Sequence, residues 1–187
     1  MYMQNLDWQL LKSEHIVKDR WISLRSDTCK MPNGRIVTPY YVYEYPTWVN
    51  VVAITKQKEV VLVQQYRHGC QKTLLELPSG VMETTDMSLT EAIKRELAEE
   101  TGYTGKEFIH TCTVSANPAN HNNLTHCFLA LDVELTKDIN LDETEEIRVV
   151  LKPLDEVIKS LKNNDFLQAL HVSSLFHALM YMNIINI

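Results

Sequence analysis

Hydrophobic and polar positions alternate along much of the first half of the chain, with the two-residue period of strands that bury one face. Residues 21–27 follow this pattern, and Asn33 with Gly34 supplies a strong signal for a hairpin turn. The segment after the turn is rich in β-branched and aromatic residues, which favour strands, and Pro46 ends it. The strands predicted in this half span residues 21–27, 35–45, 48–55, 60–66 and 74–77.

The second half opens with a segment of helical period. Apolar residues recur on one side from Leu89 to Thr101, Ser88 and Glu91 form a capping box before it, and Gly102 follows the last turn. Strands at 107–113, 125–134 and 147–151 and helices at 154–162 and 166–182 complete the prediction. The pattern predicts an α+β fold, with an N-terminal strand region over residues 1–45 and the main domain over residues 46–187.

Composition and charge restrict the classes of function. The chain has 187 residues and a net charge of -6, which argues against a nucleic-acid surface because such surfaces cluster Lys and Arg. No apolar run approaches the roughly 20 residues that span a bilayer, and the N-terminus lacks the apolar core of a signal peptide. The four cysteines form no CxxC pair, so we expect no zinc site and no disulfide framework. These features predict a cytoplasmic protein.

Three carboxylates gather on the central helix in an unfavourable pattern. Glu96, Glu99 and Glu100 stand at i, i+3 and i+4, where like charges destabilise a helix by about 0.2–0.5 kcal/mol per pair. They also lie in the last turn, where the helix dipole prefers cations. A divalent cation would reverse both effects, since magnesium binds carboxylate oxygens. The alternative is a solvated acidic face in which Arg95 pairs with Glu91 or Glu99.

The residues around these carboxylates form a recognisable motif. The segment Arg95–Tyr103 reads R-E-L-A-E-E-T-G-Y, and Gly80 precedes it across a loop. This resembles the Nudix box, G-x5-E-x7-R-E-U-x-E-E-x-G-U, and matches its second half at every defined position. The first half departs from the pattern, because the distance from Gly80 to Arg95 is one residue longer and Asp86 stands where the first Glu is expected. We interpret this as a one-residue insertion in the loop before the helix.

The resemblance implies a Nudix α/β/α sandwich with a mixed sheet that hydrolyses a diphosphate with Mg²⁺, which Mn²⁺ can replace. Carried over by position, Glu96 and Glu100 are metal ligands, and Glu99 is a third ligand or a partner in the same cluster. Arg95 orients these carboxylates, and the backbone carbonyl of Ser79 contacts a metal. The chemistry expected of such metals is to clamp the diphosphate and to lower the pKa of a bound water.

An acidic segment, Asp142–Glu146, precedes the last predicted strand. Enzymes that this chain resembles take their general base from a loop at this place. The resemblance implies Glu143 as the base and Glu145 as a further metal ligand, and the two assignments can be exchanged. The alternative is a solvated acidic turn.

Flanking residues are similar to the ADP-ribose pyrophosphatase group within the Nudix family. The similarity rests on Val61–Arg67, on Leu75–Gly80 and on Pro32–Gly34. It implies that Arg67 contacts the substrate and that Glu76 lies near the nucleotide end. The alternative for Arg67 is a salt bridge at the end of a strand.

Aromatic residues and a polar loop suggest further contacts with the substrate and with a second chain. The first 50 residues carry many rings, among them Trp48, and such rings are enriched in interface cores and base-stacking sites. The resemblance implies a homodimer whose N-terminal strands help to build the substrate site of the partner. His121, in the polar segment 116–123, is a candidate substrate-binding residue; the alternative is an ordinary loop.

The resemblance predicts hydrolysis of a nucleoside-diphosphate sugar, with ADP-ribose as the first choice of substrate and AMP and ribose 5-phosphate as its products. GDP-mannose or another sugar nucleotide is the alternative within the same class. A different class is a Nudix module that senses a nucleotide without catalysis. The intact helix glutamates argue against that class, as does a C-terminal tail too short for a DNA-binding domain.

Overall fold

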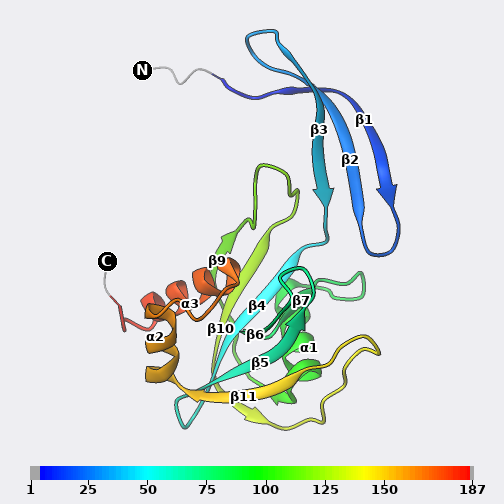
Figure 1. Cartoon of the computed structure of the whole chain (residues 1–187). Helices are drawn as coiled ribbons and strands as arrows, with labels where there is room; N and C mark the ends of the chain where they lie inside the picture. The colour runs from blue at the N-terminus through cyan, green and yellow to red at the C-terminus, as the bar shows by residue number, and fades with distance from the viewer. Residues whose placement is uncertain (1–4, 186–187) are drawn as a thin grey trace. The chain divides into compact units, whose positions relative to one another are not determined.

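A computed structural model describes residues 5–185, which form two compact units, each with its own sheet (Figure 1). The first unit, unit 1, contains the described residues up to Pro46 together with Asn117–Asn123. The second, unit 2, contains Thr47–Ala116 and the described residues from Leu124 onward. Within residues 5–185, no helix is long and apolar enough to cross a bilayer.

Unit 1 is built on a three-stranded antiparallel sheet in the order β1-β2-β3. Its strands are β1 (Gln9–Lys18), β2 (Ser23–Lys30) and β3 (Ile36–Glu44). Gly34 closes the β2–β3 turn with a φ of 85° and donates its N–H to the carbonyl of Met31 at 2.9 Å. The sequence did not predict β1. Its apolar residues come in adjacent pairs, and the register shifts between Leu10 and Lys12 and between His15 and Val17 interrupt the alternation.

Polar side chains join the three strands of unit 1. The Arg25 guanidinium donates to Asp27 at 3.1 Å and to Glu44 at 2.9 Å, and the Ser13 hydroxyl donates to Asp27 at 2.6 Å. Hydrogen bonds from Ser23, His15 and Arg25 lower the pKa of Glu44 to about 2. This network adds to the backbone pairing of the strands, and Val42 is the one buried apolar side chain among the described residues of unit 1.

Unit 2 contains a mixed sheet in which β4 and β10 pair in parallel and the other pairs are antiparallel. The order is β11-β5-β4-β10-β8, with β6 beside β5, β7 beside β4 and β9 beside β10. The strands are β4 (Trp48–Thr55), β5 (Glu59–Arg67), β6 (Lys72–Glu76), β7 (Ser79–Val81), β8 (Tyr103–Thr104), β9 (Ile109–Val114), β10 (Thr125–Leu135) and β11 (Arg148–Pro153).

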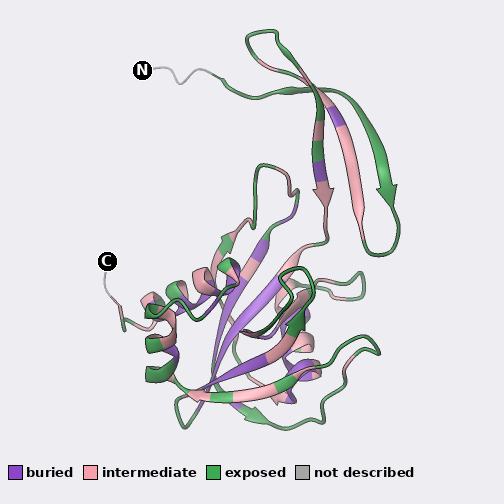
Figure 2. Ribbon diagram, in the orientation of Figure 1, coloured by how far each residue is buried: buried purple, intermediate pink, exposed green. Residues whose placement is uncertain are grey.

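Helices cover both faces of this sheet. Helix α1 (Leu89–Thr101) packs on one face, and α2 (Leu154–Lys162) and α3 (Ala169–Tyr181) pack on the other. Buried side chains fill both layers between sheet and helices. In Figure 2 the ribbon of β4 is coloured as buried over most of its length. The alternation along β4 divides it between them: Val49, Val51 and Ala53 belong to the α1 layer, and Val52 and Ile54 to the other. The α/β/α sandwich predicted from the sequence is confirmed.

Local signals placed α1 correctly. The Ser88 hydroxyl accepts the N–H of Glu91 at 3.2 Å, and Gly102 ends the helix with a φ of 75°. The second bond of the capping box differs from the expected one, because the Glu91 carboxylate accepts the N–H of Met87 rather than that of Ser88. Helix α3 was predicted from residue 166, which is wrong at its start. It begins at Ala169, where the side chain of Gln168 supplies the N-terminal cap.

Candidate active site

A cavity of about 460 Å³ lies in unit 2, where β4 and β10 begin, β5 ends, and α1 ends near β7. Its size is typical of small-molecule sites. Of the site residues predicted from the sequence, five line it: Trp48, Arg67, Ser79, Glu100 and Glu145. Residues from five separate segments of the chain therefore meet in one pocket.

Glu100 is the buried carboxylate of this pocket. Its exposed fraction is 4%, and one of its oxygens accepts the backbone N–H of Ser79 at 3.0 Å. Burial raises the pKa of Glu100 to about 8, and the nearby carboxylates of Glu96 and Glu145 add to this effect. A carboxylate so placed favours a proton or a metal cation beside it.

Gly80 leaves the space that Glu96 occupies. A Cβ atom at position 80 would lie 2.1–2.3 Å from the carboxylate atoms of Glu96, far inside van der Waals contact. Burial also raises the pKa of Glu96. The glycine that opens the motif is therefore needed for the close approach of a metal-ligand candidate rather than for a backbone turn.

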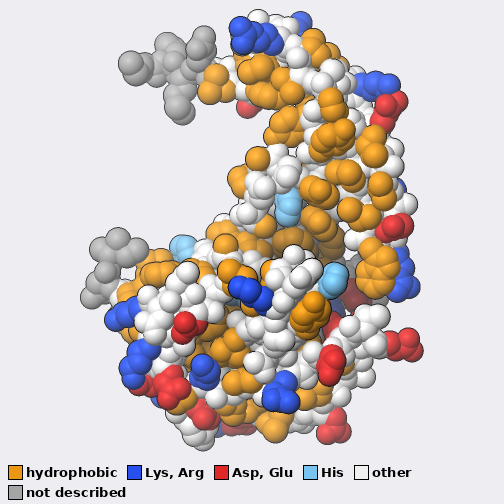
Figure 3. Space-filling model, viewed as in Figure 1, with side chains coloured by type: hydrophobic (Ala, Val, Ile, Leu, Met, Phe, Trp, Pro, Cys, Tyr) orange, Lys and Arg blue, Asp and Glu red, His pale blue; other side chains and the backbone are white. Residues whose placement is uncertain are grey.

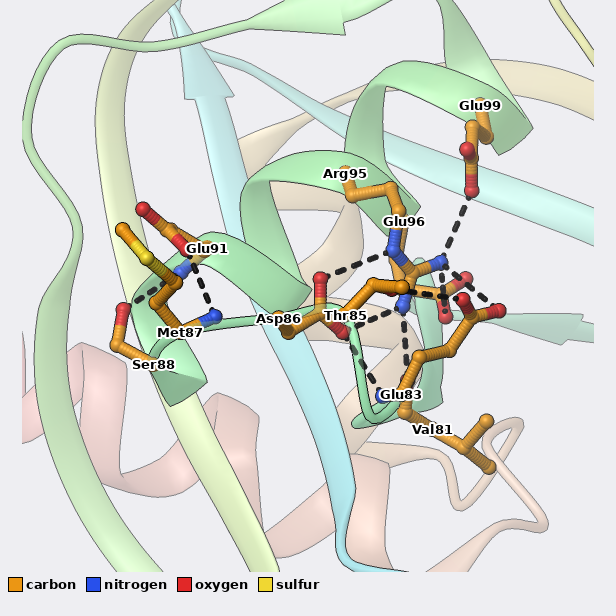
Figure 4. A network of polar contacts seen from close by, with 10 residues as sticks. All are labelled: Val81, Glu83, Thr85, Asp86, Met87, Ser88, Glu91, Arg95, Glu96 and Glu99. Carbon is orange, nitrogen blue, oxygen red and sulfur yellow. Dashed lines mark hydrogen bonds and ion pairs between the residues drawn. The ribbon is translucent and has the colours of Figure 1, made fainter.

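Arg95 holds the acidic residues of the motif together (Figure 4). It donates two hydrogen bonds to Asp86, at 2.9 and 3.2 Å, and one to the Val81 carbonyl at 2.9 Å. It also donates to Glu96 and Glu99, each at 3.0 Å. The hydrogen bonds from Arg95 lower the pKa of Asp86. Asp86 thus anchors one edge of the Arg95 guanidinium through two hydrogen bonds, despite the one-residue insertion between the two residues.

The donors present in this region suit a hard divalent cation. Glu96 and Glu100 offer carboxylate oxygens, and backbone carbonyls lie on β7 beside them. Within residues 5–185, no three His, Cys, Asp or Glu side chains converge closely enough to hold a metal alone. Hard divalent cations such as magnesium commonly bind one or two protein carboxylates, and waters and substrate phosphates complete their shell.

Arg67 and Glu76 form a pair at the pocket wall. The buried Glu76 carboxylate accepts two bonds from Arg67, at 2.6 and 3.0 Å, and one from Gln65 at 3.2 Å. The Arg67 side chain is 44% exposed and lines the pocket. The salt bridge considered from the sequence is therefore present, and it holds the Arg67 guanidinium at the wall of the cavity. Glu76 is the residue that fixes Arg67 in place.

The acidic loop brings one of its two candidates to the pocket. Glu145 lines the cavity, and its carboxylate accepts the N–H of Asp142 at 3.2 Å. Glu143 is exposed and does not line the cavity.

His121 belongs to unit 1, where its ring packs against two tyrosines. The ring centroids lie 5.8 Å from Tyr43 and 5.1 Å from Tyr45. The segment Asn117–Asn123, which contains His121, also pairs with β3, since Tyr43 donates its N–H to the Asn120 carbonyl at 2.7 Å. The predicted role of His121 in substrate binding stays a prediction.

Among the residues that line the cavity and were not predicted as site residues, three are buried and polar: Asn50, Thr125 and His171. All three are buried polar residues in strands or helices that are otherwise largely apolar. Nδ1 of His171 accepts the N–H of Leu77 at 3.3 Å, and burial lowers the pKa of this imidazole to about 3. The one signal in the sequence was Asn50, a carboxamide inside the apolar run of β4.

Comparisons with known proteins agree with this geometry. Residues 44–171 match the NUDIX domain, and residues 8–43 match the nucleoside diphosphate sugar hydrolase N-terminal domain. An ADP-ribose pyrophosphatase of Bacillus subtilis (strain 168) is 27% identical over 168 residues, which cover 89% of this chain and 90% of that protein. An ADP-sugar pyrophosphatase of Mus musculus is 30% identical over 176 residues, which cover 86% and 77%.

A solved structure shares the fold. The crystal structure of an ADP compounds hydrolase matches 96% of this chain and 97% of its own, with a TM-score of 0.84 and 24% sequence identity. The domain match spans more than half of the chain, and it includes the carboxylate helix and every residue that lines the cavity. The chain belongs to the Nudix family of hydrolases.

Proposed function

We propose that this Nudix hydrolase cleaves the diphosphate of ADP-ribose, or of a closely related nucleoside-diphosphate sugar, and that it yields AMP and ribose 5-phosphate from ADP-ribose. The observation that carries the proposal is the cavity in which Arg67 faces the carboxylate cluster of Glu100 and Glu145. In such a site the Arg67 guanidinium and the metal ions held by the carboxylates can contact the same bound diphosphate. The names of two similar proteins, an ADP-ribose pyrophosphatase and an ADP-sugar pyrophosphatase, support this substrate class.

The proposed cofactor is Mg²⁺, with Mn²⁺ able to replace it. Glu96, Glu100 and the Ser79 carbonyl are the proposed ligands, and Glu145 is a further one. When bound, divalent cations neutralise charge on the diphosphate and lower the pKa of a bound water. Arg95 holds Glu96 and Glu99 in place through its hydrogen bonds.

The remaining polar groups bind the substrate and accept a proton. Arg67 binds diphosphate oxygens, and Glu76 keeps the guanidinium in position. Glu143 and Glu145 are the two candidates for the general base. The position of Glu145 at the cavity supports a role at the metal for that residue, which leaves Glu143 as the base. Trp48, at the cavity, and His121, among the tyrosine rings of unit 1, are the proposed contacts to the nucleoside.

We further propose a homodimer, with residues 1–45 as the region for dimerisation and substrate contact and residues 46–187 as the catalytic domain. Of the 21 large apolar side chains exposed in residues 5–185, nine lie between Leu6 and Tyr41. Figure 3 shows hydrophobic side chains gathered over this region. Apolar surface of this extent is typical of interfaces. The four free cysteines support a reducing, cytoplasmic location.

A substrate panel tests the proposed activity. Pure protein with magnesium is offered ADP-ribose, GDP-mannose, UDP-glucose, NADH and diadenosine polyphosphates, and the products are identified by chromatography. We expect the highest kcat/KM for ADP-ribose, with activity lost in chelator and restored by magnesium or manganese. Preferred cleavage of GDP-mannose would show that GDP-mannose, and not ADP-ribose, is the substrate. Tight binding of a nucleotide without any turnover would favour the sensing module.

A further inference from the structure

The most buried polar residues that line the cavity are Asn50 and Thr125. They lie on β4 and β10, which pair in parallel with Thr125 opposite Trp48 and Asn50 opposite Cys127. Asn50 shares its strand face with Val52 and Ile54, and Thr125 shares its face with Leu129, so both point to the α3 side of the sheet. Both are almost fully buried, with exposed fractions of 1% and 2%, and both line the cavity.

These two side chains have unused hydrogen-bonding capacity. Within residues 5–185, neither the Nδ2 nor the Oδ1 atom of Asn50 has a nitrogen or oxygen partner, and the same holds for Oγ1 of Thr125. The Cys127 thiol lies beside Asn50, but thiols are weak donors and acceptors. Buried polar groups without partners are rare in folded proteins, because each has lost its hydrogen bonds to water. In a binding cavity, such groups indicate a ligand that completes them.

His171 adds a donor at the same place. Its Nδ1 atom accepts the Leu77 N–H, so the neutral ring carries its proton on Nε2. The cavity therefore offers an amide donor and acceptor from Asn50, a hydroxyl from Thr125 and an imidazole N–H from His171.

We propose that Asn50 and Thr125, with His171 beside them, bind the vicinal hydroxyls of the sugar ring that is attached to the diphosphate. This inference rests on the proposed function. Asn50 pairs with Ser79 across β4 and β7, so it stands one strand away from the proposed metal site. The group that reaches Asn50 is therefore the one next to the diphosphate.

The chemistry of the hydroxyl pair matches these residues. Each sugar hydroxyl donates one hydrogen bond and accepts others, so two neighbouring hydroxyls can satisfy both ends of a carboxamide. A phosphate group offers acceptors only and would leave Oδ1 of Asn50 without a donor. The nucleoside ribose and the terminal ribose of ADP-ribose carry the same chemistry, and the experiment distinguishes them.

The test compares hydrolysis of three compounds: ADP-ribose, its 2′-deoxyadenosine form and the form with a terminal 2-deoxyribose. The variants are Asn50→Leu, which keeps the branching and the number of heavy atoms, and Thr125→Val, which keeps the shape. The control is Ser174→Ala. Within residues 5–185 the buried Ser174 hydroxyl has no nitrogen or oxygen partner, and like Asn50 it lies beside the Cys127 thiol, but it does not line the cavity. The quantity compared is the ratio of kcat/KM values between compounds, in which losses common to all three cancel.

We expect wild type to prefer ADP-ribose over one deoxy compound by about tenfold or more, because the missing hydroxyl leaves buried groups unpaired. The compound that is disfavoured identifies the ribose that is bound. Asn50→Leu should reduce this preference to about twofold or less, and Ser174→Ala should retain it. The melting temperature of Asn50→Leu should stay level or rise, since an unpaired polar group is removed; a structural role would lower it. If Asn50→Leu does not fold, Thr125→Val carries the same comparison.

Equal losses on all three compounds in Asn50→Leu would overturn the proposal, because they would assign Asn50 to the diphosphate or to the fold. So would a wild-type preference that both variants keep. The hypoxanthine analogue of ADP-ribose is measured as a fourth compound, because a carboxamide can pair with a base edge. A change in Asn50→Leu that is confined to selectivity between ADP-ribose and this analogue would also overturn the proposal. If wild type cleaves none of the compounds, the proposed function fails. Calorimetric titration of the same compounds with magnesium then measures the hydroxyl preference directly.

Discussion

The two units of this chain are stabilised in different ways. Of the 26 buried apolar side chains within residues 5–185, Val42 is the one in unit 1, and the other 25 lie in unit 2. Unit 2 has an apolar layer on each face of its sheet, whereas the strands of unit 1 are joined by backbone pairing and by an ion-pair network around Arg25. Small sheets without an apolar layer are marginally stable in water. The apolar layers of unit 2 are therefore sufficient for it to fold and to form the cavity. Unit 1 has no such layer, so we expect it to need contact with another surface to be stable.

The largest effect should come from the buried carboxylate of unit 2. Glu100→Gln removes a proposed metal ligand, so we expect kcat to fall by several orders of magnitude while circular dichroism shows the fold retained. Glu91→Gln, on the exposed side of the same helix, is the control and should keep its activity. Near-normal activity in both Glu96→Gln and Glu100→Gln would show that the metal site is elsewhere.

Removing most of unit 1 separates the contributions of the two units. A chain lacking residues 1–46 should still unfold cooperatively, because the buried apolar layers lie in unit 2. It should lose dimerisation and most of its affinity for the nucleotide. Light scattering and calorimetry measure the two losses. A truncated monomer with full activity would contradict the role proposed for unit 1.

A substitution at Gly80 tests the geometry of the motif without removing a ligand. Gly80→Ala places a methyl group where the Glu96 carboxylate lies. That carboxylate is the flexible end of a side chain, so it should move aside at little cost in stability. We expect kcat to fall about tenfold or more, since small displacements of catalytic groups are costly, with a small change in melting temperature. Gly69→Ala, where a Cβ meets no atom within 4 Å, is the control. Unchanged activity in Gly80→Ala would show that the position of Glu96 is not critical.

A pair of isoleucines tests the dimer directly. Ile16 in β1 is 56% exposed, and Ile139 in unit 2 is 48% exposed. Ile16→Glu should halve the mass measured by light scattering, because it introduces a charge into the proposed interface. Ile139→Glu should leave the mass unchanged. Equal behaviour of the two variants would place the interface outside β1.

The smallest effects concern pH, and the two units should respond with opposite signs in the absence of metal. The pKa of Glu44 is depressed to about 2, so its stabilisation of unit 1 is present above pH 4.5 and is lost as the pH falls toward 2. The pKa of Glu100 is raised to about 8, so unit 2 loses stability as the pH rises from 4.5 through 8. Glu44→Gln should abolish the first trend and Glu100→Gln the second, as measured by thermal melts in chelator. If Glu44→Gln and Glu100→Gln show the same dependence of melting temperature on pH, these assignments are wrong.

Local signals in the sequence explain what could be predicted. Helix α1 was located by its capping residues and its apolar period, and the motif residues followed from its spacing. Strand β1 was missed because its bulges break the alternation on which strand prediction depends. These features depend on residues close together in the chain.

Features that depend on contacts between distant segments of the chain could not be predicted from the sequence. Asn50 and Thr125 meet because β4 and β10 pair in parallel, and nothing local to either residue indicates this. The role of Asp86 also depends on the loop folding back onto Arg95, which the one-residue insertion concealed. The buried partner of Arg67 was known as a motif residue, but its function as an anchor appeared only with the contacts of Glu76.

The most direct test of the central claim is hydrolysis of ADP-ribose in ¹⁸O-labelled water with magnesium, followed by mass spectrometry of the products. The account predicts AMP and ribose 5-phosphate in equal amounts, with one ¹⁸O atom in the phosphate group of one of them, because water attacks phosphorus within the diphosphate. Release of free adenine or inorganic phosphate, or label on a sugar carbon, would contradict it.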